Sequence, residues 1–302
     1  MASSPAGASR FLSPEVVAGL GTLELKARTV VEGLLLGLHR SPFRGSSVEF
    51  AEYRQYMPGD DPGTVDWKVY ARSDRHYVKK YEHDTNVDVQ LLLDVSASMA
   101  YRSGTGMTKL HYAQCLVAAL AYLLTGQRDA VALGIYDDQL RQYVPPAVKA
   151  GQLTRLLVAL DHAVPGAASD TAAALQRVAD RLRRRGLVVV CSDLLDDQAR
   201  VVDGLRLLRA RGMEVVVFHV LDEAELTFPF EQAGTFRDVE TGEQVLTYGP
   251  AARQNYLEAV ERWRTTYVTE LRAAGIDYQL ARTSAPLDLS LLGWLGARGR
   301  TL

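Results

Sequence analysis

The sequence predicts an α/β fold in which a mostly parallel sheet carries helices on both faces. From residue 86 onward, short apolar runs alternate with longer segments of helical periodicity, and the connections between them are short. The first run, VDVQLLLDV at Val87–Val95, is apolar enough for a buried strand. Strands that alternate with helices in this way pair in parallel, and the helices cover both faces of the sheet.

Length and composition agree with a folded globular protein. The 302 residues correspond to about two domains of ~150 residues, or to one large α/β domain with an extension. A hydrophobic content of 47% with 23% charged residues excludes a disordered or fibrous chain. The 34 basic and 36 acidic residues give a net charge of −2, so we expect no nucleic-acid partner.

Cysteine content and hydropathy indicate a cytoplasmic protein. Cys115 and Cys191 are too few for a disulfide framework and form no CxxC pair, so we expect reduced thiols. The first ten residues, MASSPAGASR, lack the apolar core of a signal peptide. The longest clearly apolar run, Cys115–Leu124, is shorter than the ~18 residues that a membrane span needs.

The region before the sheet divides into two parts. We expect residues 1–10 to form a flexible tail and residues 11–85 to form an N-terminal helical and signature segment. Ser13-Pro14 is typical of a helix start, and the apolar spacing from there to Leu38 predicts one or two helices. Residues 41–85 are rich in Gly, Pro, Asp and aromatic residues, which favours turns and short strands.

The α/β domain is expected to span residues 86–302. Its predicted strands are 87–95, 129–136, 187–191, 214–220 and 276–280, and its predicted helices are 108–126, 149–162, 170–185, 198–211, 251–274 and 286–297. An insertion at about 222–248 interrupts this alternation. We expect a hairpin there, with Thr241-Gly242 at its turn.

Carboxylates and hydroxyls follow the predicted strands. Asp94, Ser96 and Ser98 come directly after the first strand, and Asp193 follows the strand at 187–191. A further loop carries Ala168-Ser169-Asp170-Thr171 before a helix. Because parallel strands end at the same edge of a sheet, we expect these oxygen donors to meet there. They suit Mg²⁺, whereas the absence of His and Cys from the set argues against zinc or copper.

The pattern Asp94-x-Ser96-x-Ser98, with a second-loop hydroxyl and Asp193, resembles the metal-ion-dependent adhesion site of von Willebrand factor A domains. That resemblance implies a von Willebrand factor A-like (Rossmann-like) fold and five ligands to Mg²⁺ or Mn²⁺: Asp94, Ser96, Ser98, Ser169 and Asp193. Ser169 stands where the adhesion-site family usually has Thr in a Gly-Gly-Thr-Asp context. Thr171 is the competing choice for the second loop.

The upstream segment resembles the bacterial family called domain of unknown function 58. The resemblance rests on Ser41–Phe50 (SPFRGSSVEF), Pro58–Pro62 (PGDDP), Asp66-Trp67-Lys68 and Ala71-Arg72. Gly63 departs from it, because members commonly have Arg there. Members often carry N-terminal membrane helices, so we expect this chain to resemble the short, soluble branch. The resemblance also implies a MoxR-type AAA+ ATPase as partner.

These observations predict an adaptor that binds an acidic residue of a partner protein through a metal ion. With a MoxR-type AAA+ ATPase, it would act in the assembly or maturation of other protein complexes. We expect no enzymatic activity, because the chain has no P-loop and no Gly-x-Ser-x-Gly elbow around Ser96 or Ser98. Two alternatives stay open: a Mg²⁺-dependent hydrolase in which Asp193 orients a water, and a structural scaffold with a vestigial metal site.

Overall fold

A computed structural model describes residues 13–39, 53–55, 77–79, 87–166, 168–239 and 242–298. Its central sheet has six strands in the order β10-β7-β6-β3-β4-β5. The strands are β3 (Asp88–Asp94), β4 (Ala130–Tyr136), β5 (Leu140–Ala147), β6 (Gly186–Ser192), β7 (Glu214–Leu221) and β10 (Asp277–Arg282). All neighbouring pairs are parallel except β4 and β5. The predicted mostly parallel sheet is therefore confirmed.

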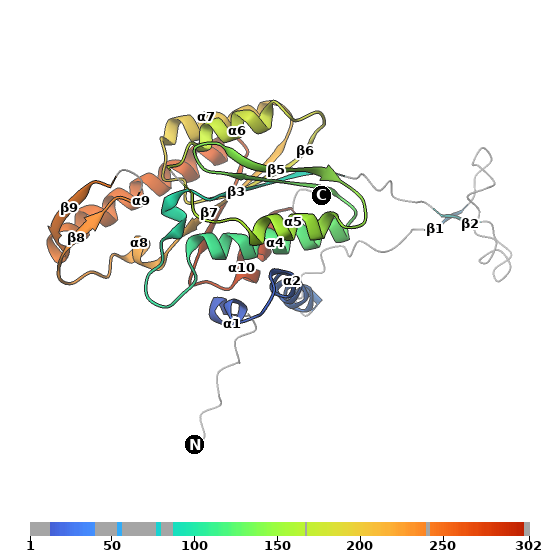
Figure 1. Ribbon diagram of the computed structural model, residues 1–302. Helices are drawn as coiled ribbons and strands as arrows, with labels where there is room; N and C mark the ends of the chain where they lie inside the picture. Colours follow the sequence, from blue (N-terminus) through green and yellow to red (C-terminus); the bar gives the residue numbers. More distant parts are fainter. Residues whose placement is uncertain are drawn as a thin grey trace, which may run out of the picture.

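Helices cover both faces of this sheet (Figure 1). One face packs against α4 (Lys109–Gly126), α5 (Gln152–Asp161) and α10 (Leu287–Arg298). The other packs against α6 (Thr171–Ala179), α7 (Gln198–Ala210) and α9 (Gly249–Ala273). Nearly every residue of β3, β4, β6 and β7 is buried, as expected for strands covered on both sides.

The N-terminal segment begins with two helices, α1 (Pro14–Ala18) and α2 (Leu23–His39). Ser13 caps α1 by accepting the backbone N–H of Val16, and Pro14 takes the first helical position. The buried residues Ala27, Val31 and Leu34 of α2 join the core, where α2 packs on α4 and α10. Residues 14–39 thus add a further layer beneath one face of the α/β domain.

The structure differs from the sequence prediction at three elements. The helix predicted over 170–185 ends at Ala179, and Arg181 lies instead against the ring of Tyr143, 5.4 Å from its centroid. Strand β5 and the short helix α8 (Glu223–Thr227) were not predicted. The prolines Pro145 and Pro146 obscured β5, yet an edge strand tolerates residues without an N–H.

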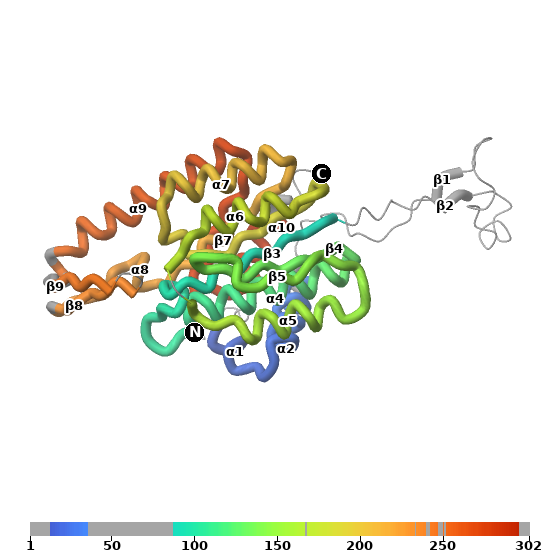
Figure 2. The backbone as a smooth tube through the Cα atoms, turned by 45° about the horizontal axis from the view of Figure 1, so that its top comes forward, coloured from blue at the N-terminus to red at the C-terminus, as the bar shows by residue number. Residues whose placement is uncertain are grey.

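The predicted hairpin is present as β8 (Ala233–Arg237) and β9 (Gln244–Tyr248), which pair antiparallel. Gly242 at its turn has a φ of +78°, a conformation that glycine adopts without strain. The hairpin and the start of α9 project beyond the end of the sheet at which β3 finishes (Figure 2).

Strands β1 (Tyr53–Gln55) and β2 (Tyr77–Lys79) form a separate antiparallel pair. The four signature motifs between Ser41 and Arg72 lie outside the described residues.

Candidate metal site at the carboxyl end of the sheet

Asp94 ends the central strand β3 and is fully buried. Its Oδ1 accepts the backbone N–H of Ser96 at 2.8 Å, and its Oδ2 accepts the hydroxyl of Ser192 at 2.6 Å. Because Ser192 ends the neighbouring strand β6, two strands together orient this carboxylate.

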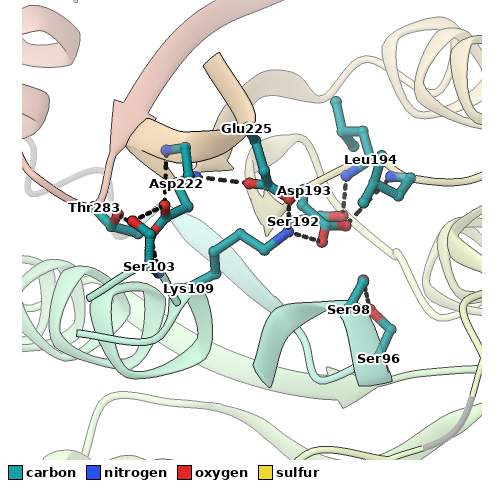
Figure 3. Close-up of polar contacts among 12 residues, drawn as sticks. Ser96, Ser98, Ser103, Lys109, Ser192, Asp193, Leu194, Asp222, Glu225 and Thr283 are labelled. Atoms are coloured by element: carbon teal, nitrogen blue, oxygen red, sulfur yellow. Dashed lines mark hydrogen bonds and ion pairs between the residues drawn. The ribbon is translucent and has the colours of Figure 1, made fainter. Parts of the chain in front are cut away.

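Ser96 and Ser98 lie in the turn that follows Asp94, where the short 3₁₀ helix Ala97–Ala100 begins. Both side chains are buried, and their hydroxyl oxygens lie 3.1 Å apart (Figure 3). The structure therefore brings the two predicted serine ligands together beside the end of β3.

Asp193 directly follows β6 and is also fully buried. Its Oδ2 accepts from the Lys109 ammonium at 2.8 Å, and its Oδ1 accepts the backbone N–H of Leu195 at 3.3 Å. Its backbone carbonyl lies 2.9 Å from Nε2 of the buried His219 on β7. Asp193 is thus held by contacts with its own loop, with β7 and with α4.

Lys109 is the site residue that the sequence prediction missed. It is the first residue of α4, and its buried ammonium donates to Asp193 and, at 2.6 Å, to Oε1 of Glu225 (Figure 3). Burial by itself disfavours the ammonium, but the charges of Asp193 and Glu225 raise the pKa of Lys109 above its ordinary value. A lysine in the first turn of a helix is unfavourable because its charge opposes the helix dipole. Its position at the start of α4 was therefore the one sign in the sequence that a negatively charged partner lies nearby.

The second loop contributes both candidate hydroxyls. The oxygens of Ser169 and Thr171 lie 3.1 Å apart, with Ser169 partly exposed and Thr171 fully buried. The backbone N–H of Thr171 donates to Oδ2 of Asp196 in the loop that follows β6. Thr171 also lies beside the buried Tyr136 at the end of β4.

Burial and neighbouring negative charge raise the pKa values of Asp94 and Tyr136 at this edge of the sheet. The pKa of Asp94 is raised to about 7, chiefly by burial and in addition by the charge of Asp193, while hydrogen bonds from Ser192 and Ser96 oppose the shift. Burial also raises the pKa of Tyr136 well above its usual value, and the charge of Asp94 adds to the effect. Added positive charge here would stabilise the ionised form of Asp94.

The donor set fits a hard divalent cation. The buried oxygens of Asp94, Ser96 and Ser98, with Asp193 and a second-loop hydroxyl, match the oxygen preference of Mg²⁺. The Tyr136 hydroxyl is buried at the same edge, beside the side chains of Thr171 and Ser192. The described residues contain no group of three or more His, Cys, Asp or Glu suited to a metal, so the serine and threonine hydroxyls would have to supply part of the coordination.

Asp222, at the end of β7, fixes the loops around this edge. Its carboxylate accepts from the backbone N–H and hydroxyl of Ser103 and from the hydroxyl of Thr283 at 3.0 Å (Figure 3). In return, the backbone N–H of Asp222 donates to Oε2 of Glu225 at 2.7 Å, which completes the capping box of α8.

The strand order, the antiparallel edge strand and the carboxylate-and-hydroxyl edge define a von Willebrand factor A-like α/β domain. The chain belongs to the family described as "Protein of unknown function DUF58", which matches residues 52–266. Uncharacterized proteins of Mycobacterium tuberculosis and Mycobacterium bovis are each 28% identical over 296 residues, which is 95% of this chain and 91% of theirs. The predicted family is therefore confirmed.

Two solved structures also resemble this chain. BatB from Bacteroides thetaiotaomicron is 15% identical and has a TM-score of 0.48, with 72% of this chain and all of that chain covered. The SpRpn10 VWA domain is 12% identical and has a TM-score of 0.39, with 68% of this chain and 94% of that chain covered. Within the described residues, no helix is both long and apolar enough to cross a membrane.

Proposed function

We propose that this protein is a binding module that recognises an acidic side chain of a partner protein through a divalent cation, Mg²⁺ or Mn²⁺. The observation that carries the proposal is the convergence of two buried carboxylates, Asp94 and Asp193, with the buried hydroxyls of Ser96 and Ser98. Asp94, Ser96, Ser98, Asp193 and a second-loop hydroxyl, Ser169 or Thr171, would hold the cation.

The charges explain why binding would depend on the metal. A partner's carboxylate that approaches the metal-free site meets the like charge of Asp94 and, offset in part by its ion pair with Lys109, that of Asp193. A like charge at ~4 Å costs about 1–4 kcal/mol for effective dielectrics of 80 to 20. A bound divalent cation offsets those charges and offers a position for an incoming oxygen ligand. Recognition would then require both the cation and an acidic residue on the partner.

The proposed partner is a MoxR-type AAA+ ATPase, with which the protein would act as an adaptor in the assembly or maturation of other complexes. Support for this partner comes from the family resemblance, and the site adds the chemistry of the contact. A protein that acts as an adaptor does not need a catalytic base beside the metal ion. We propose that this protein is not an enzyme.

The test measures binding of the purified ATPase to immobilised protein in excess Mg²⁺ and in EDTA. Wild type is compared with Asp94→Asn, which keeps the shape of the side chain, and with the control Asp203→Asn on the exposed surface of α7. We expect binding in Mg²⁺ that is lost in EDTA and in Asp94→Asn but kept in Asp203→Asn.

Equal binding under all conditions would place the interface away from Asp94. Phosphate release from ATP or from a phosphomonoester by the isolated protein, abolished in Asp94→Asn, would instead support the hydrolase alternative.

A further inference from the structure

Lys109 is a buried cation at the edge where we propose that a second cation binds. Its side chain is fully buried, and its ammonium contacts Asp193 on one side and Glu225 on the other. The ring of Tyr101 lies on a third side, with its centroid 5.8 Å away. An ammonium taken out of water is stable only when it is paired, and Asp193 and Glu225 both pair with Lys109.

The two candidate metal carboxylates therefore differ in their surroundings. Within the part of the chain that the structure describes, Asp94 accepts from neutral donors, the Ser96 N–H and the Ser192 hydroxyl. One oxygen of Asp193, in contrast, is already bound to a full positive charge. A divalent ion at this edge finds Asp94 available and must share Asp193 with Lys109.

Glu225 gives the ammonium a second partner. Its Oε1 lies 2.6 Å from Nζ of Lys109, against 2.8 Å for Oδ2 of Asp193. The other oxygen of Glu225 accepts the backbone N–H of Asp222, so the side chain is fixed in α8. Glu225 is thus placed to hold Lys109 when the contact with Asp193 weakens.

We propose that Lys109 is a resident counter-cation that competes with the divalent ion for Asp193 and weakens ion binding, and that Glu225 relieves this competition. The inference rests on the proposed function, because it concerns the same cation site. It also means that ion binding is coupled through Glu225 to α8, the element that leads into the β8–β9 hairpin.

The test is calorimetric titration of Mg²⁺ into wild type, Glu225→Gln and the double variant Lys109→Met/Glu225→Gln. The double variant removes the Lys109 ammonium and the Glu225 carboxylate together. Glu225 is therefore not left as an unpaired negative charge near Asp193. We expect it to bind Mg²⁺ at least about tenfold more tightly than wild type, because a like charge beside the ion is gone. Glu225→Gln leaves Lys109 with Asp193 alone, and we expect severalfold weaker binding.

Thermal unfolding in EDTA checks that each variant is folded, and Lys109→Arg, which keeps the charge, should show none of the gain. Equal Mg²⁺ affinity in wild type and in the double variant would overturn the role of Lys109 while leaving the metal site intact. If the double variant does not fold, tighter binding of Mg²⁺ by Glu225→Gln than by wild type would overturn the proposed role of Lys109. Absence of Mg²⁺ binding in every folded protein would overturn the proposed function as well.

Discussion

The hydroxyl of Ser192 donates to Oδ2 of Asp94 at 2.6 Å and so joins the ends of the neighbouring strands β6 and β3. Both side chains are fully buried. The same hydroxyl oxygen accepts the backbone N–H of Leu194, which directly follows Asp193 and has a φ of 54°. Ser192 therefore ties two of the loops of the candidate metal site together.

Ser192→Ala is expected to lower the free energy of unfolding by about 1–3 kcal/mol, because it leaves the Leu194 N–H and an oxygen of Asp94 buried without a partner. Urea denaturation of the metal-free protein measures the change. Ser169→Ala, at a partly exposed hydroxyl of the same edge, should stay within about 0.5 kcal/mol of wild type. An equal effect of the two substitutions would contradict the linking role of Ser192.

Divalent cations are expected to stabilise the folded protein. A ligand that binds only the folded state, at a hundred times its Kd, adds about 2.7 kcal/mol to the free energy of unfolding. Mg²⁺ should therefore raise Tm in wild type and leave Tm of Asp94→Asn unchanged. Differential scanning calorimetry with and without EDTA provides the measurement, and Asp203→Asn serves as the control that should retain the shift.

Removal of the second-loop hydroxyls should distinguish the two candidate ligands. Thr171 is fully buried beside Tyr136, whereas Ser169 is partly exposed. We expect Thr171→Val to weaken Mg²⁺ affinity by at least about tenfold, equivalent to ~1.4 kcal/mol, and Ser169→Ala to change it by less than about threefold. Titration calorimetry decides between them, and the reverse order of effects would make Ser169 the ligand.

The packing of α2 on α4 should depend on pH. The ammonium of Lys26 donates to Nε2 of His111 at 3.1 Å, a contact that needs a neutral imidazole. Burial lowers the pKa of His111, the charge of Lys26 lowers it further, and that of Asp161 opposes the shift. Because the unfolded chain then binds protons more readily than the folded one, stability is complete above the usual histidine pKa of ~6.5 and falls as the pH drops below it.

Hydrogen exchange of the α2 amides at pH 5 and pH 7.5 tests this dependence, with faster exchange expected at the lower pH after correction for intrinsic rates. His111→Gln removes the titrating ring and should remove the additional acid sensitivity. Identical protection of α2 at both pH values in wild type would show that the Lys26–His111 contact does not contribute.

The sequence was sufficient to predict the sheet because its strands are buried on both faces and appear as apolar runs such as VDVQLLLDV. It also predicted that Asp94 and Asp193 would lie at the same edge of the sheet, since one ends and the other follows two neighbouring parallel strands. The edge strand β5 escaped because RQYVPPA is partly exposed and contains two prolines. An edge strand needs neither continuous burial nor every N–H, so its local pattern is weak.

The contacts of Lys109 could not be predicted in the same way. Its partners Asp193 and Glu225 lie 84 and 116 residues further along the chain, and no local spacing joins them. Glu225 belongs to α8, five residues that are too short for a visible apolar period. Long-range pairing of buried charges is fixed by the fold as a whole, and only the unusual position of a lysine at a helix start pointed to it.

The prolines of β5 have a consequence for how copies of this protein meet one another. An edge strand with free N–H and C=O groups is a template for edge-to-edge aggregation. Pro145 and Pro146 have no N–H to offer, and the carbonyl of Pro145 accepts instead from the side chain of Gln152 at 2.9 Å. This stretch of the sheet border is therefore closed to strand addition, which protects a domain built around a highly apolar sheet from growing into fibres along that side.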